Sequence, residues 1–248
     1  SRDHIKEFYA QLSAAANMVI SVVGDIDPQK TLETIRKKFG KIPAKDIKSA
    51  FFTEKDVQGP IVKEETMDKE QAIVMFGFHG VALDNPDRYP LEVLTEILGS
   101  SFSGRFFVNI REKYGDAYTM GAVHVPGPDL GFIYMYVLTK PGSADKVKML
   151  MEEEIADLQN VPVSDEELDT MKVYLKGRAK ASLEKSSSVA FTTSLDELYG
   201  LGYDYYKQYD ALIDAVTKED VQAAAQKYLD LTKSVAVITR PPSKESTP

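Results

Sequence analysis

Hydrophobic and polar residues alternate along this chain with two different periods, one typical of helices and one typical of strands. Segments in which apolar residues recur every three to four positions predict amphipathic helices, and short apolar runs bounded by turn residues predict strands. The predicted helices are residues 3–12, 28–39, 86–98, 104–113, 143–160, 164–185, 188–200, 205–216 and 218–229. The predicted strands are residues 17–23, 71–77, 117–125, 131–139 and 234–239.

An internal similarity suggests how these elements are grouped into domains. Residues 217–238 align without gaps with residues 1–22, and each segment predicts a capped helix followed by a buried strand. Because similarity at long spacing indicates duplicated units, we interpret residues 1–45 as the end of a preceding, homologous domain. The alternative is coincidence, since helix-then-strand endings are common. The other predicted parts are a linker at 46–56, a domain at 57–242 and a polar tail at 243–248.

The amino-acid composition limits the classes to which this protein can belong. The chain has 248 residues, of which 43% are hydrophobic, and this is enough for a substantial core. Its net charge of -8 opposes non-specific binding to phosphates, so nucleic acid is not an expected partner. No apolar run approaches the roughly 18 residues of a membrane span. Cysteine is absent, so redox usage does not indicate a compartment, and periplasm and cytoplasm both stay open.

The histidines do not form a recognisable metal motif. A His-x-x-Glu-His zinc site requires two imidazoles on one helix face with a carboxylate beside them. The chain has only His4, His79 and His124, and the segment from His4 that begins this pattern ends in Phe8. We therefore expect surface or strand histidines and no metal ligand in this chain.

Two local features concern helix ends. The loop from Gly99 to Gly104 lacks the Lys-Ser/Thr ending of a phosphate-binding loop and follows a predicted helix instead of a strand. It is predicted to be a tight connection between two helices, with Gly99 ending the first. Further along, Ser164 and Glu167 have the spacing of a capping box at the start of helix 164–185.

The most specific chemical feature is an Arg and a Tyr on either side of a short turn. Arg111 and Tyr118 are seven residues apart, with Gly115 between them. Both side chains can donate hydrogen bonds to a carbonyl oxygen, yet neither can carry out hydrolysis alone. The alternative is that Arg111 is a favourable cation at a helix end and Tyr118 a half-buried strand residue.

Several motifs, taken in order, resemble the C-terminal, non-catalytic domain of the pitrilysin/insulinase/mitochondrial-processing-peptidase family, the inverzincins. The resemblance covers nearly the whole chain. Its Arg-Glu-Lys-x-Gly-x-Ala-Tyr block is fairly specific, although Asp116 stands where many relatives carry an apolar residue. The motifs are Asn17 to Asp27 (NMVISVVGDID), Lys38 to Pro43 (KFGKIP), Leu98-Gly99 with Ser103 to Phe107 (SGRFF), Ile110 to Tyr118 (IREKYGDAY) and Val216 to Val221 (VTKEDV) with its closing strand.

The resemblance implies both a fold and a division of labour. In that family two homologous halves face each other around a chamber, and the zinc motif lies in the N-terminal half. This chain should then be α+β, with a mostly antiparallel sheet flanked by helices, as one half of a two-domain metallopeptidase clamshell. The second half has lost the metal ligands and contributes an Arg and a Tyr that hold the substrate near the zinc. By their place in the motif, these residues are Arg111 and Tyr118.

The expected function is therefore that of the substrate-binding half of a zinc metallopeptidase that cleaves peptides in a closed chamber. No catalytic residue is expected in this chain, and zinc is expected in the catalytic half or in a partner subunit. The expected partners are that zinc-bearing domain or subunit, a peptide substrate and, as a further candidate, a second copy of this chain. The alternative is a proteolytically inactive scaffold or interaction subunit with the same fold.

Overall fold

A computed structural model describes residues 1–45, 57–99, 102–115 and 117–242. The predicted linker at 46–56, the predicted tail at 243–248 and Asp116 lie outside the described residues. The chain forms two compact units. The first comprises the described residues of 1–53 and 178–209, and the second comprises those of 54–177 and 210–248.

A mixed sheet of five strands organises the described part of the second unit. Its strands lie in the order β1-β5-β2-β4-β3. β1 and β5 are parallel, whereas β5–β2, β2–β4 and β4–β3 are antiparallel pairs. The prediction of an α+β fold with a mostly antiparallel sheet is therefore confirmed. The strands are β1 (Ile61–Thr66), β2 (Ala72–His79), β3 (Ala117–Val125), β4 (Phe132–Thr139) and β5 (Val235–Arg240).

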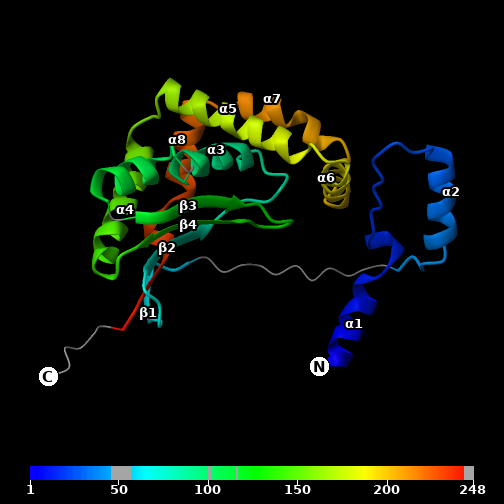
Figure 1. Cartoon of the computed structure of the whole chain (residues 1–248), viewed down its shortest axis with the longest axis horizontal. Helices are drawn as coiled ribbons and strands as arrows, with labels where there is room; N and C mark the ends of the chain where they lie inside the picture. The colour runs from blue at the N-terminus through cyan, green and yellow to red at the C-terminus, as the bar shows by residue number, and fades with distance from the viewer. Residues whose placement is uncertain (46–56, 100–101, 116, 243–248) are drawn as a thin grey trace. The chain divides into compact units, whose positions relative to one another are not determined.

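Helices cover one face of this sheet, as Figure 1 shows. α3 (Arg88–Gly99) packs on β3, and α8 (Lys218–Tyr228) packs against α3 and α4 (Ala144–Asn160). Alternate side chains of the central strands point into this layer and are fully buried because the strand period is two. Those of β2 and β4 include Val74, Phe76, Ile133, Met135 and Val137. The other helical segments are η2 (Phe106–Glu112), η3 (Pro141–Ser143), α5 (Asp165–Ser182), α7 (Tyr209–Asp214) and η5 (Leu231–Lys233).

The described residues of the first unit form helices and irregular segments. It contains α1 (Arg2–Leu12), η1 (Ala15–Asn17), α2 (Pro28–Phe39), α6 (Ser186–Leu198), η4 (Tyr205–Gln208) and the end of α5. Asp27 caps α2, because its carboxylate accepts the N–H groups of Gln29 and Lys30 at 2.9 and 3.1 Å. Within the same unit, the hydroxyls of Ser21 and Thr193 are hydrogen-bonded at 2.6 Å.

Three local predictions differ from the structure. The predicted strand at 17–23 is not a strand, because the described part of the first unit holds no other strand to pair with it. The predicted helix at 104–113 is mainly the π-helix η2. The predicted helix at 205–216 is divided into η4 and α7. Strand β1 was not predicted, since all six of its residues are exposed and leave no buried alternation in the sequence.

Candidate functional site

The segment that carries Arg111 is a π-helix, η2, of seven residues. The N–H of Lys113 bonds to the carbonyl of Val108, five residues earlier, and this is the spacing that defines a π-helix. Phe106 and Ile110 are fully buried and anchor η2 in the core, whereas Arg111 is exposed. The two buried side chains therefore hold one side of η2 against the core, and the exposed side is available for contacts outside the core.

A glycine turn and a β-bulge connect Arg111 to Tyr118. Gly115 has φ +65, in the left-handed region that favours glycine, and its N–H bonds to the Arg111 carbonyl at 2.8 Å. In the following strand, Ala117 pairs with Thr139 and Thr119 pairs with Leu138, so Tyr118 is the additional residue of a bulge. Bulges of this kind redirect a side chain and are over-represented next to active sites.

The structure brings the two predicted site residues together. Nη1 of Arg111 donates a hydrogen bond to the backbone carbonyl of Tyr118 at 3.3 Å. The Arg111 guanidinium carbon also lies 5.1 Å from the ring centroid of Phe107. Tyr118 is 46% exposed. Arg111 is therefore joined to the backbone of Tyr118, and both residues are exposed.

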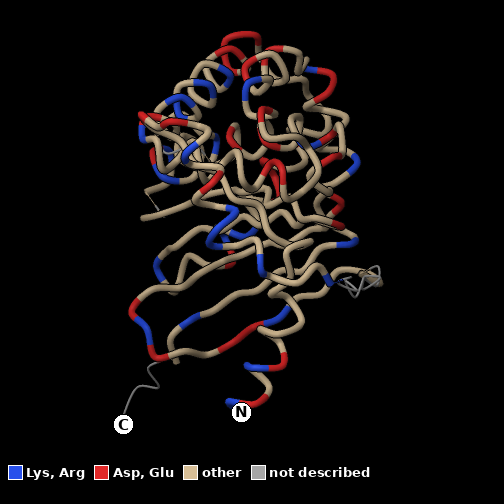
Figure 2. The backbone as a smooth tube through the Cα atoms, turned by 90° about the vertical axis from the view of Figure 1, so that its right-hand side faces the viewer, with Lys and Arg blue, Asp and Glu red and all other residues tan. Residues whose placement is uncertain are grey.

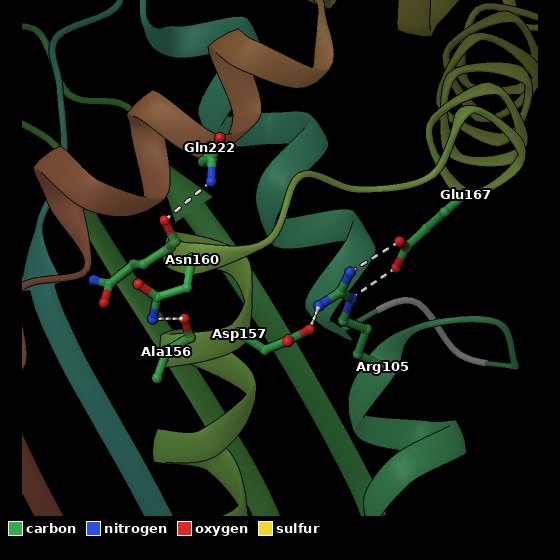
Figure 3. Close-up of polar contacts among 7 residues, drawn as sticks. Arg105, Ala156, Asp157, Asn160, Glu167 and Gln222 are labelled. Atoms are coloured by element: carbon green, nitrogen blue, oxygen red, sulfur yellow. Dashed lines mark hydrogen bonds and ion pairs between the residues drawn. The ribbon is translucent and has the colours of Figure 1, made fainter.

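Arg105 is a residue of this region to which the sequence analysis gave no role. Its side chain is only 13% exposed, and three of its nitrogens are hydrogen-bonded to carboxylates (Figure 3). Nε and Nη2 donate to the two oxygens of Glu167 on α5 at 2.8 and 3.0 Å. Nη1 donates to Asp157 on α4 at 2.6 Å. In the sequence, Arg105 stands out only as part of the SGRFF motif, and its two partners could not be identified because they lie far away in the chain.

The charges around Arg105 are unbalanced towards the negative side. Burial opposes the charged form of Arg105, but the hydrogen bond with Glu167 and the charges of Glu167 and Asp157 outweigh it and raise the pKa of Arg105. Glu154 lies in the same cluster. Burial raises the pKa of Glu154, against the opposing effect of its hydrogen bond with Asn109. Arg105 is therefore bonded to two acidic side chains, and the nearby charge of a third, Glu154, also raises its pKa.

The histidines are not arranged as metal ligands. Nε2 of His124 accepts the N–H of Val81 at 3.2 Å, so this nitrogen carries no proton. Burial and the charge of Arg88 lower the pKa of His124 from 6.5 to about 4. Across the described ranges 1–45, 57–99, 102–115 and 117–242, no group of three His, Asp or Glu side chains could hold a metal ion. These residues do not fit a zinc site.

Two further properties bear on binding to nucleic acids and membranes: the distribution of charged residues and the length of apolar helices. Lys and Arg positions are interspersed with Asp and Glu positions along the described helices (Figure 2), and the net charge of the chain is -8. None of the helices in the described part of the chain is long and apolar enough to span a bilayer.

The family of the chain follows from its sequence similarity to known proteins. The sequence model described as "Peptidase M16 inactive domain" matches residues 1–175. The chain belongs to the peptidase M16 inactive-domain family. The resemblance drawn from the Arg-Glu-Lys-x-Gly-x-Ala-Tyr block is therefore confirmed.

The relatives of this M16 inactive domain are longer proteins. The "uncharacterized zinc protease YmxG" of Bacillus subtilis (strain 168) is 29% identical over 245 residues, which are 96% of this chain and 57% of that protein. An "uncharacterized zinc protease" of Rickettsia bellii is 26% identical over 247 residues, with the same two shares. The chain thus spans just over half the length of the curated relatives it matches.

Solved structures show the same fold. A protease from Helicobacter pylori has a TM-score of 0.81 and 22% identity, over 88% of this chain and 54% of that chain. The peptidase M16 inactive domain from Pseudomonas fluorescens has a TM-score of 0.79 and 20% identity, over 88% of this chain and 52% of that chain.

Proposed function

We propose that this M16 inactive domain is the substrate-binding, non-catalytic half of a zinc metallopeptidase. We place the zinc site in a homologous catalytic half, either on the same polypeptide or on a partner subunit. The zinc-protease names of its relatives and their greater length support this division. The observation that carries the proposal is the hydrogen bond from Arg111 to the Tyr118 carbonyl, which joins two exposed residues.

The pair is suited to binding a peptide during hydrolysis of its amide bond. Negative charge grows on the carbonyl oxygen in the transition state, and a donor held at that oxygen is typically worth about 10²- to 10³-fold in rate. In the proposal, the Tyr118 hydroxyl donates to this oxygen and Arg111 binds the substrate backbone. Neither residue supplies the nucleophile, so this half alone should cleave no peptide.

Two substitutions test the pair in the enzyme that contains both halves. Tyr118→Phe keeps the ring and removes one donor, so kcat/KM should fall by about 10²-fold. Arg111→Ala should raise KM by roughly tenfold or more, the size expected for hydrogen bonds from a charged donor. Zinc content, measured by elemental analysis, should not change in either variant.

Tyr114→Phe provides a matched control. Tyr114 is 40% exposed and lies in the same segment, before the Gly115 turn, but it is not part of the proposed pair. This variant should retain wild-type kinetics. If Tyr118→Phe and Arg111→Ala also hydrolyse peptides at wild-type rates, the pair is structural, and the chain is better described as a scaffold subunit of the same fold.

We further propose that residues 1–45 are the end of a preceding homologous domain and that residues 57–242 form the non-catalytic domain. The apolar run at residues 18–23 supports this view, since it has the composition of a buried strand but pairs with no strand among the described residues of the first unit. Such a segment pairs with whatever strand edge is available. That edge belongs to the catalytic half or to a second copy of this chain.

A further inference from the structure

Arg105 and Arg111 lie at opposite ends of the same short helix. Arg105 is the N-cap of η2, and Arg111 is the sixth of its seven residues. Through Glu167 and Asp157, Arg105 ties the beginning of η2 to the first turn of α5 and to the last turns of α4 (Figure 3). The position of η2 thus depends on two helices that are distant in the sequence, as well as on its own buried anchors.

Stability alone does not explain this arrangement. A buried ion pair contributes little net stability, because removing the charges from water costs about as much as their attraction returns. What a guanidinium fork adds is direction, since two parallel bonds to one carboxylate fix the plane of the group. At Arg105 the fork to Glu167 is combined with a third bond to Asp157, so the guanidinium has little rotational freedom.

The π-helical geometry of η2 is a second indication that this segment has a functional role. π-helical segments are rare and are found frequently at functional sites, because they are less favourable than α-helices and need support from their surroundings. In η2 the buried Phe106 and Ile110 support one side. Arg105 supports the N-terminal end, whereas Arg111 near the other end contacts Phe107 and the Tyr118 carbonyl.

We infer that Arg105 is a positioning residue that holds η2 in register so that Arg111 is presented to the substrate. This inference rests on the proposed function, in which Arg111 binds the peptide backbone. Arg105 itself does not touch the substrate. Its effect reaches the substrate through Arg111, and this dependence can be measured.

The test is a double-mutant cycle in the enzyme that contains both halves. Arg105→Gln should raise KM about threefold to tenfold and leave kcat nearly unchanged, because the loss concerns substrate binding. In an Arg111→Ala background, the same substitution should add little further increase in KM, since the residue that it positions is already absent. Arg105→Lys keeps the charge but not the fork, and it should restore KM only in part.

A second readout does not require activity. In the 248-residue chain, hydrogen exchange should become faster at residues 106–112 in Arg105→Gln, with β2 and β4 unchanged. If Arg105→Gln fails to fold, Glu167→Gln serves instead, because it leaves Arg105 paired with Asp157 and weakens only the fork. It should produce smaller changes in KM and in exchange, with the same signs.

Arg240 supplies the matched control. It forms a comparable fork with Asp145, at 3.0 and 2.8 Å, but lies at the end of β5. Arg240→Gln should leave KM and exchange at residues 106–112 unchanged. The inference is wrong if Arg111→Ala raises KM while Arg105→Gln does not, or if the two effects on KM multiply fully. If Arg111→Ala has no effect, the proposed function itself fails, and exchange at residues 106–112 still decides whether Arg105 holds η2.

Discussion

His124 should make the second unit sensitive to acid. Its pKa is about 4 in the folded chain and about 6.5 as a free side chain, so the folded state resists protonation between these values while the unfolded state takes up a proton. Stability should therefore be fully present above pH 6.5 and be lost progressively as the pH falls towards 4. At 1.36 kcal/mol per unit, this shift of the pKa corresponds to about 3 kcal/mol at most.

The substitution His124→Gln isolates this contribution. Glutamine can place an oxygen near the position of Nε2 and accept the Val81 N–H, but it does not titrate. Urea denaturation followed by circular dichroism, at several pH values from 4 to 7.5, gives the free energy of unfolding of each variant. Relative to wild type, His124→Gln should gain roughly 2–3 kcal/mol between pH 7 and pH 4.5.

A comparison of three proteins makes the result decisive. His4→Gln makes the same chemical change at an exposed histidine on α1 and serves as the control. If His124→Gln shows the same pH slope as wild type, then burial and the charge of Arg88 do not perturb His124 as the structure indicates. A slope of the opposite sign would mean that His124 is protonated in the folded chain.

Two further predictions concern packing and domain limits. Gly99→Ala would place a Cβ against the backbone nitrogen of Ala122, so it should lower stability by about 1–3 kcal/mol or more. Gly177→Ala changes a helical glycine with open space around it, and it should be neutral or slightly stabilising in thermal denaturation. Deletion of residues 1–45 should leave residues 57–242 able to fold, and loss of their cooperative melting transition would contradict the proposed domain limits.

Burial pattern explains which strands the sequence could predict. The hairpin strands at 117–125 and 131–139 were predicted within one residue of β3 and β4, because β4 alternates regularly and a Pro-Gly-Pro-Asp turn separates the two strands. β1 was missed because each of its residues is exposed, so its place at the sheet edge depends on pairing with β5. Residues 18–23 show the converse, since this apolar run has no strand beside it among the described residues and is not itself a strand.

The candidate site was predictable only where its residues are close in sequence. Arg111 and Tyr118 belong to one motif, although the hydrogen bond from Arg111 to the Tyr118 carbonyl and the bulge at Tyr118 needed the structure. Arg105 could not be paired from sequence, because Asp157 and Glu167 lie 52 and 62 residues away. Several acidic residues on the same helices were equally available partners.

Glu167 shows how tertiary structure reassigns a side chain that local sequence had placed elsewhere. The spacing of Ser164 and Glu167 predicts a capping box, in which each side chain bonds to the backbone N–H of the other residue. In the structure the Ser164 hydroxyl accepts the Glu167 N–H at 3.1 Å, as a capping box requires. The Glu167 carboxylate instead accepts two bonds from Arg105. A charge-assisted fork is stronger than a bond to a neutral backbone donor, and it also neutralises a partly buried arginine. The carboxylate in the first turn of α5 therefore binds the beginning of η2. In our proposal, the positioning of Arg111 depends on this contact between Glu167 and Arg105.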